Sequence, residues 1–188
     1  MGFLIERLFS DLSENVTELL GLRMGAPAGF MDRSMRPGTL WTEELLHAVG
    51  TCQILVALLS PRYLTSEWCG MEWHAFAQRT VDRSGASASG RQGCIIPVVW
   101  IPLSGEQLPR QVSAEMQFSP KNRPDPQAVT EYQDGGVFGL MRTQQEACYQ
   151  IVVWQLSQEI NHIYRSQRLK HRKFKREDLS NVFQGEML

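Results

Sequence analysis

Two uninterrupted apolar runs constrain what this chain can fold into. They are "CQILVALLS" at residues 52–60 and "CIIPVVWIP" at residues 94–102, and neither alternates between apolar and polar side chains. A strand that is apolar on both sides must be covered on both faces, which is typical of parallel sheets flanked by helices. Helical patterns lie before, between and after the two runs. The sequence therefore predicts an α/β fold with a parallel sheet.

Apolar residues that recur every three or four positions predict helices around these strands. Ser60-Pro61 and Ser66 are residue types that often start helices, and Gly21 is a typical stop. The expected helices cover residues 3–20, 42–50, 66–79 and about 144–165.

The remaining segments carry weaker patterns. "APAGFMD" at residues 26–32 is a candidate for a short strand, and "VFGLMR" at residues 137–142 is a candidate for a short strand or a turn. Residues 103–136 are rich in Pro, Gln and Asp, which predicts an irregular connection.

Composition places the chain among ordinary globular proteins. With 188 residues, 43 % of them apolar and 21 % charged, it can build a sizeable core and is not expected to be disordered as a whole. We expect one domain at residues 1–165 and a basic, partly disordered tail at residues 166–188. No apolar run approaches about 18 residues, so no membrane span is expected. The four cysteines lack metal-type spacing, which indicates reduced thiols and a cytoplasmic protein.

The tail opens with a basic run. Seven Lys or Arg residues lie between Arg165 and Arg176, in a chain whose net charge is only −1. Such a run either contacts nucleic acid or anionic lipid, or is a solvated extension of the last helix. The second interpretation is the simpler one, because Phe174 alone interrupts the charges near the end of the run. No specific nucleic-acid partner is therefore expected.

Glu72 is an ionisable residue in the most apolar part of its helix. Cys69 and Phe76 lie three positions before it and four after it, and Trp68 lies one turn back on the same side. Burying a charged carboxylate among such neighbours costs several kcal/mol unless it is paired. Glu72 therefore either pairs with Arg79 or a loop arginine at the edge of the core, or faces a ligand at the edge of a cleft.

The segment "GFMDRSMRPGTLWTEELLHAVGTCQILVALLSPRYLTSEWCGMEWHAF" resembles the central part of a Toll/interleukin receptor (TIR) domain. The family's Ser-Pro-x-Tyr and Ser-x-Trp-Cys-x-x-Glu signature corresponds to "SPRYLTSEWCGME", and "CIIPVVW" corresponds to its next strand. The set "FMDRSMRPG", "SPRY", "SEWCGMEW", "QRTVD" and "FGLM" is similar in particular to bacterial TIR-like proteins of the FxsC type.

This resemblance implies a flavodoxin-like α/β domain that either cleaves NAD+ or assembles as a non-catalytic scaffold. In the enzymatic members a glutamate at the position of Glu72 promotes the loss of nicotinamide, so Glu72 is the expected catalytic residue. NAD+ is then a substrate, and neither a cofactor nor a metal is expected. The expected pocket residues are Phe30, Asp32, Trp41 and Trp68, although Asp32 alternatively caps its own loop and Trp41 alternatively packs in the core.

The resemblance also implies partners. The loop that holds Arg36-Pro37-Gly38 forms an interface between TIR domains, binds phosphates or is a solvated turn. We expect a homo-oligomer formed through this loop, with other TIR domains as further partners.

One family element has no counterpart in the sequence. TIR domains begin with a strand, whereas this chain enters its first helix almost at once. In a flavodoxin-like sheet the first strand lies between the second and third, and its loss leaves backbone groups without partners. We therefore expect that the first strand is missing and that Met1 is an internal methionine of a longer chain.

Overall fold

The structure is a computed structural model that describes residues 2–23, 28–31, 43–82, 93–103, 109, 112 and 125–184. Its elements are α1 (Gly2–Leu20), α2 (Glu43–Thr51), β1 (Leu55–Leu59), α3 (Pro61–Leu64), α4 (Glu67–Ala77), β2 (Ile95–Val99), α6 (Pro126–Arg142), α7 (Glu146–Ser166) and the 3-10 helix η3 (Arg176–Asp178).

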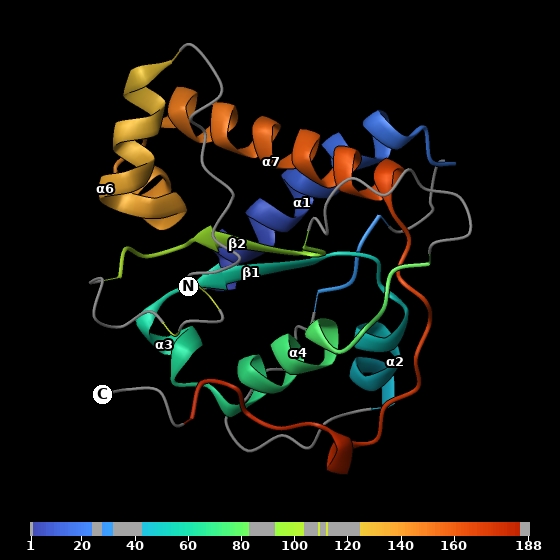
Figure 1. The fold of residues 1–188 in the computed structure, drawn as a ribbon. Helices are drawn as coiled ribbons and strands as arrows, with labels where there is room; N and C mark the ends of the chain where they lie inside the picture. The colour runs from blue at the N-terminus through green and yellow to red at the C-terminus, as the bar shows by residue number, and fades with distance from the viewer. Residues whose placement is uncertain are drawn as a thin grey trace.

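β1 and β2 form a parallel pair between two layers of helices (Figure 1). The register sets Leu55 opposite Ile95 and Leu59 opposite Val99. Helices α1, α6 and α7 lie on one face of the pair, and α2 and α4 lie on the other. The predicted α/β architecture with a parallel sheet flanked by helices is confirmed, and it is consistent with a flavodoxin-like fold.

Successive strand residues point into two separate apolar cores. In β2, Ile95 packs into the core beneath α2 and α4, whereas Ile96 and Val98 pack into the core beneath α1, α6 and α7. In β1, Ala57 and Leu59 belong to the first of these cores. Because both faces are covered, every position of the strands favours an apolar residue, and the two sequence runs show no polar alternation.

Three predicted helix boundaries have the expected physical basis. The Ser60 hydroxyl accepts a hydrogen bond from the backbone N–H of Tyr63 at the start of α3, and the Ser66 hydroxyl accepts one from Cys69 at the start of α4. Gly21 follows α1 with φ of +63°, a left-handed conformation that favours glycine.

Helix α6 was not predicted. It occupies the last part of the segment expected to be irregular, residues 103–136, and all of the strand or turn expected at residues 137–142, so both predictions are wrong between Pro126 and Arg142. The Asp125 carboxylate caps the helix by accepting hydrogen bonds from the N–H groups of Gln127 and Ala128. Gly136 interrupts the helix with φ of +62°, and a Cβ there would lie 2.6 Å from the carbonyl oxygen of Trp100. Asp-Pro and the glycines look like loop residues in the sequence, yet here they start and bend a helix.

The short strand predicted at residues 26–32 has no counterpart in residues 28–31, which are not a strand. Its other residues lie outside the described part of the chain. The described residues form a sheet of two strands, β1 and β2. The absence of a first strand stays a prediction.

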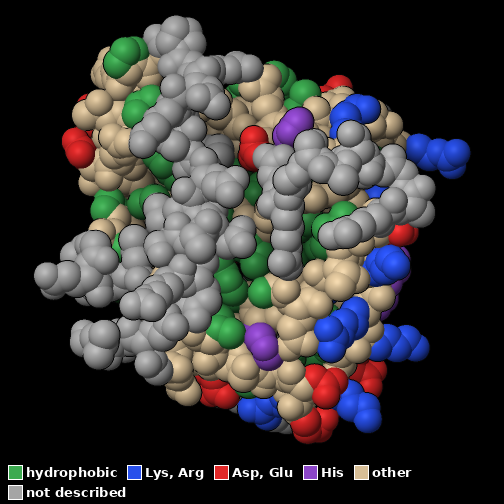
Figure 2. Space-filling view, viewed as in Figure 1, with side chains coloured by type: hydrophobic (Ala, Val, Ile, Leu, Met, Phe, Trp, Pro, Cys, Tyr) green, Lys and Arg blue, Asp and Glu red, His purple; other side chains and the backbone are tan. Residues whose placement is uncertain are grey.

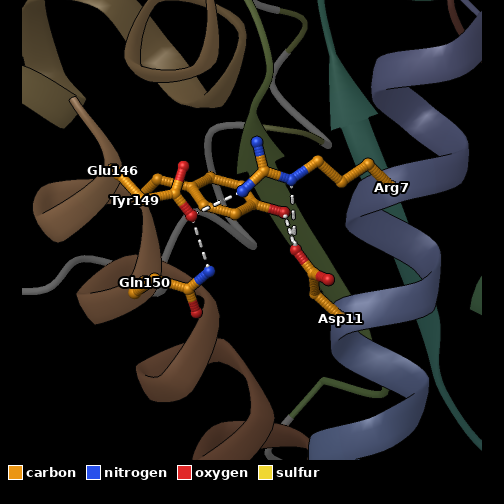
Figure 3. A network of polar contacts seen from close by, with 5 residues as sticks. All are labelled: Arg7, Asp11, Glu146, Tyr149 and Gln150. Carbon is orange, nitrogen blue, oxygen red and sulfur yellow. Dashed lines mark hydrogen bonds and ion pairs between the residues drawn. The ribbon is translucent and has the colours of Figure 1, made fainter. Parts of the chain in front are cut away.

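A polar network joins α1 to α7 across the outer face of their core (Figure 3). The hydroxyl of Tyr149, a fully buried residue, donates a hydrogen bond of 2.6 Å to the Asp11 carboxylate. The Arg7 guanidinium contacts Glu146 and lies 4.8 Å above the Tyr149 ring. Residues more than 130 positions apart in sequence are thereby held side by side.

The segment after α7, residues 167–184, crosses α2 and α4 on their outer side, and we call it the C-terminal segment (Figure 1). Its four buried apolar residues enter the core of α2 and α4: Leu169, Phe174, Leu179 and Phe183. Two backbone hydrogen bonds hold it against the domain: the N–H of Lys170 donates to the Thr80 carbonyl, and the N–H of Arg172 donates to the Gly50 carbonyl.

A solvated extension of the last helix was expected here. Instead α7 ends at Ser166 and the described part of the C-terminal segment supplies core residues. The sequence did not predict this packing, because the buried apolar residues of the segment stand singly among many cations and form no helix or strand pattern.

We expect Tyr149→Phe to lower the free energy of unfolding by about 1–3 kcal/mol, since it removes a hydrogen bond to a charged group. Burial, reinforced by the bond to Asp11, raises the pKa of Tyr149 above its ordinary value of 10.0. The folded state thus retains a proton that the unfolded state releases above about pH 10, and stability falls as pH rises further. Urea unfolding between pH 8 and 11 should show a smaller loss for Tyr149→Phe than for the parent protein; equal losses would contradict this role.

The seating of the C-terminal segment is tested by Gly50→Ala. A Cβ at Gly50 would overlap the carbonyl oxygen of Arg172, so we expect a destabilisation of about 1–3 kcal/mol and faster tryptic cleavage at Arg168–Arg176. Gly139→Ala in α6 is the matched control, because nothing lies within 4 Å of its Cβ position. It should be neutral or stabilising by up to about 1 kcal/mol. A Gly50→Ala protein as stable as this control would show that the segment is not seated there.

Candidate functional site

Glu72 lies in the middle of α4 and is only 8 % exposed. Its helix is buried nearly all round, because the sheet covers one side and the C-terminal segment covers the other. A helix covered on all sides is expected to be apolar on all sides. The helix is therefore apolar for structural reasons, and the carboxylate is the feature that this packing does not explain.

Cys69 and Tyr63 share the electrostatic surroundings of Glu72. Burial, and then the charge of Glu72, raise the pKa of the Cys69 thiol to about 12. Burial also raises the pKa of Tyr63 well above its usual value, with further contributions from Cys69 and Glu72. At neutral pH both groups are protonated beside the carboxylate. Cys69 is therefore a poor nucleophile, and Tyr63 is a hydrogen-bond donor.

The Tyr63 hydroxyl oxygen is buried and has no hydrogen-bond partner among the described residues. A buried hydroxyl without a hydrogen-bond partner lowers the stability of the folded state by about 1–3 kcal/mol, and such groups are rare in protein cores. Tyr63 lies in α3, directly after the carboxyl end of β1. In open α/β sheets this is the end at which ligands bind.

Arg79 is not the partner of Glu72 that one interpretation of the sequence required. Helix α4 ends at Ala77, and the Arg79 guanidinium turns to the carbonyl oxygens of Val49 and Cys52. The loop arginines that were the other candidates lie outside the described residues.

The C-terminal segment contacts the outer side of α4 at four points. The Phe183 ring lies 5.8 Å from the Tyr63 ring and 5.9 Å from the Trp73 ring, measured between centroids. Arg176 lies 5.6 Å from the Trp68 ring. Gly70 leaves room for Asn181, and the backbone N–H of Ser180 donates to Nδ1 of His74. The helix that carries Glu72 is thus fixed from both sides.

The structure places only part of the predicted pocket. Trp68 precedes Glu72 by one turn, with Arg176 above its ring. Phe30 is 47 % exposed, in the coil at residues 28–31. Asp32, Trp41 and the loop Arg36-Pro37-Gly38 lie outside the described residues. The roles of these residues stay predictions.

All four cysteines are free. Within the described ranges, no group of three or more His, Cys, Asp or Glu residues is placed to hold a metal ion. No described helix is long and apolar enough to cross a bilayer.

Comparison with known protein families matches residues 11–126 to the family described as TIR domain. The match covers the helix-strand-helix region that holds α2, β1, α3, α4 and β2, and it spans more than half of the chain. This chain belongs to the TIR-domain family. No curated protein and no solved structure matches it significantly. The likeness of this TIR domain to the FxsC type stays a prediction.

Two residues of the site were not predicted. Tyr63 belongs to the "SPRY" motif, and its place one turn after a buried strand was the signal that could have drawn attention to it. Phe183 carried no such signal, because its position against Tyr63 and Trp73 depends on the path of the C-terminal segment.

The contact between His74 and Ser180 makes the stability of this TIR domain sensitive to acid. Burial, and then the charge of Arg172, lower the pKa of His74 below its ordinary value of 6.5. The neutral ring accepts the Ser180 N–H, so this contribution to stability is complete above about pH 6.5 and is lost as pH falls through the lowered pKa. We expect His74→Gln to lose less stability than the parent protein between pH 7.5 and pH 5 in urea unfolding. Equal losses would mean that His74 does not cause the acid sensitivity.

Proposed function

We propose that this TIR domain is an NAD+ glycohydrolase that releases nicotinamide and forms ADP-ribose or its cyclic form. The observation that carries the proposal is the combination of a buried carboxylate, Glu72, with the hydroxyl of Tyr63. The Tyr63 hydroxyl has no hydrogen-bond partner among the described residues, and Tyr63 follows the carboxyl end of β1. We further propose a cytoplasmic location, in which the four free cysteines stay reduced.

The chemistry needs little apparatus. When the bond between ribose C1′ and the nicotinamide nitrogen breaks, the electron pair goes to the nitrogen and the ribose becomes an oxocarbenium ion. The ring is cationic in NAD+ and leaves as neutral nicotinamide, so no acid is needed to protonate it. A carboxylate held beside C1′ stabilises the developing positive charge, and water or an adenine nitrogen then attacks C1′.

Each site residue has a proposed role. Glu72 holds the ribose next to nicotinamide and stabilises the cation, and the Tyr63 hydroxyl donates a hydrogen bond to the substrate. Trp68, Phe30 and Trp41 form the walls of the pocket, and Asp32 contacts the substrate or caps its loop.

The second candidate is a non-catalytic TIR scaffold that self-associates through the Arg36-Pro37-Gly38 loop. The low exposure of Glu72 favours this alternative, because a carboxylate that is 8 % exposed also suits a structural role. Both candidates are expected to self-associate, and they differ in whether NAD+ is cleaved.

The deciding experiment is chromatographic detection of nicotinamide released from NAD+, at dilute and at high protein concentration. We expect Glu72→Gln to reduce the turnover number by about 100-fold or more, because it removes charge stabilisation in the transition state. Tyr63→Phe should have a smaller effect.

Glu67→Gln is the matched control, since Glu67 lies on the same helix but in its exposed first turn. It should keep the parent rate. A folded protein that releases no nicotinamide at either concentration would exclude the enzyme and leave the scaffold; equal rates for the two variants would exclude Glu72 as the catalytic residue.

A further inference from the structure

We propose that the end of α7 and the start of the C-terminal segment form a binding surface for the phosphate backbone of double-stranded nucleic acid. We call this surface the basic ribbon. Its residues are Arg165, Arg168, Lys170, Arg172, Lys173, Lys175 and Arg176. This inference does not depend on NAD+ cleavage.

The charge of the protein is strongly divided. Residues 165–176 carry seven cations and no acid, whereas the remaining 12 basic and 20 acidic residues carry a net charge of −8. All seven cations are exposed, and none of them forms an ion pair with another described residue. Figure 2 shows Lys and Arg side chains along the right and lower edge, with Asp and Glu side chains among them, where Figure 1 places α2 and the C-terminal segment. The nearly neutral total therefore hides a stretch of seven exposed cations that contains no acid.

The ribbon has a fixed path. The backbone N–H of Asp82 donates to the Arg168 carbonyl (2.7 Å), and that of Leu169 donates to the Gln53 side chain (2.8 Å). Further along, Leu169 and Phe174 are buried in the core of α2 and α4. The cations between these anchors are thus displayed on an ordered support, so less conformational entropy is lost when a ligand binds.

Three of the arginines are also held by aromatic rings. The guanidinium carbon lies 4.0 Å from the ring centre for Arg168 on Tyr164, 4.9 Å for Arg172 on Phe174 and 5.6 Å for Arg176 on Trp68. Such stacking positions the guanidinium. The Arg172 Nη1 also donates to the Gln78 carbonyl oxygen (3.3 Å), and the other guanidinium N–H groups are available for phosphate oxygens.

The apolar residues decide which polyanion fits. A membrane-binding surface gains much of its affinity from apolar side chains that enter the bilayer, but Leu169 and Phe174 point into the core. Single-stranded nucleic acid is bound by bases stacked on exposed aromatic rings. Here Phe174 is buried, and the half-buried rings of Tyr164 and Trp68 are already stacked against Arg168 and Arg176. Phosphates on a duplex require only exposed cations. The expected binding is independent of base sequence, in keeping with the absence of a predicted specific nucleic-acid partner.

The test is fluorescence anisotropy of a labelled 20-base-pair duplex, made once as DNA and once as RNA, titrated with the full chain between about 30 and 200 mM salt. We expect binding that weakens steeply with salt. Lys170→Ala with Lys173→Ala should reduce the slope of log K against log salt by about 2, at roughly 0.9 per phosphate contact, and weaken binding by about 10-fold or more.

Arg62→Ala with Arg142→Ala is the matched control, because it also removes two exposed cations but from α3 and α6. It should retain the parent slope. Circular dichroism checks that both variants are folded, which we expect because all four substituted residues are exposed.

Three outcomes would overturn the proposal. They are no binding to either duplex at 30 mM salt, equal losses in the two double variants, and binding to phosphatidylserine vesicles without binding to a duplex. The last result would assign the ribbon to an anionic membrane surface.

Discussion

The fold depends on covering both faces of two short apolar strands. β1 and β2 have five residues each, and their side chains enter two cores, one on each face. The first and last helices, α1 and α7, cover one face together with α6, and the Tyr149–Asp11 bond fixes how they meet. The other face is covered by α2 and α4, and their outer side is closed by the C-terminal segment. Since burial of apolar area is the main favourable contribution to folding, neither cover is dispensable.

Covering the second face also creates the surroundings of Glu72. Helix α4 lies between the sheet and the C-terminal segment, so a carboxylate at its centre is surrounded by protein instead of water. The same packing encloses the Tyr63 hydroxyl and raises the pKa of Cys69 to about 12. In this low-dielectric setting a single charge exerts more electrostatic influence than it would at the surface. A carboxylate in such surroundings is either a structural feature that lowers stability or a preorganised reactive group.

Local chemistry was predictable from the sequence, and long-range packing was not. The strands at Leu55–Leu59 and Ile95–Val99, the capping serines Ser60 and Ser66, and the burial around Glu72 follow from apolar runs and helix periodicity. Helix α6 was missed because Asp-Pro and three glycines suggest a loop, and its stability comes from contacts with Trp100 and α7. The path of the C-terminal segment was missed because no local pattern shows that Phe174 and Phe183 pack against α2 and α4, which end more than 80 residues earlier.

The order in which these contacts occur along the chain has a consequence for synthesis. The hydrogen-bond partner of the Gln53 side chain, the N–H of Leu169, comes 116 residues later, and that of Asp11, the Tyr149 hydroxyl, comes 138 residues later. Contacts so distant in sequence slow folding, because the loop between them must close before they contribute. On a ribosome, α2, β1 and α4 emerge long before Leu169, Phe174 and Phe183, and their apolar outer side stays uncovered until those residues follow. The nascent chain therefore exposes this apolar, aggregation-prone surface early and covers it only once the C-terminal segment has emerged.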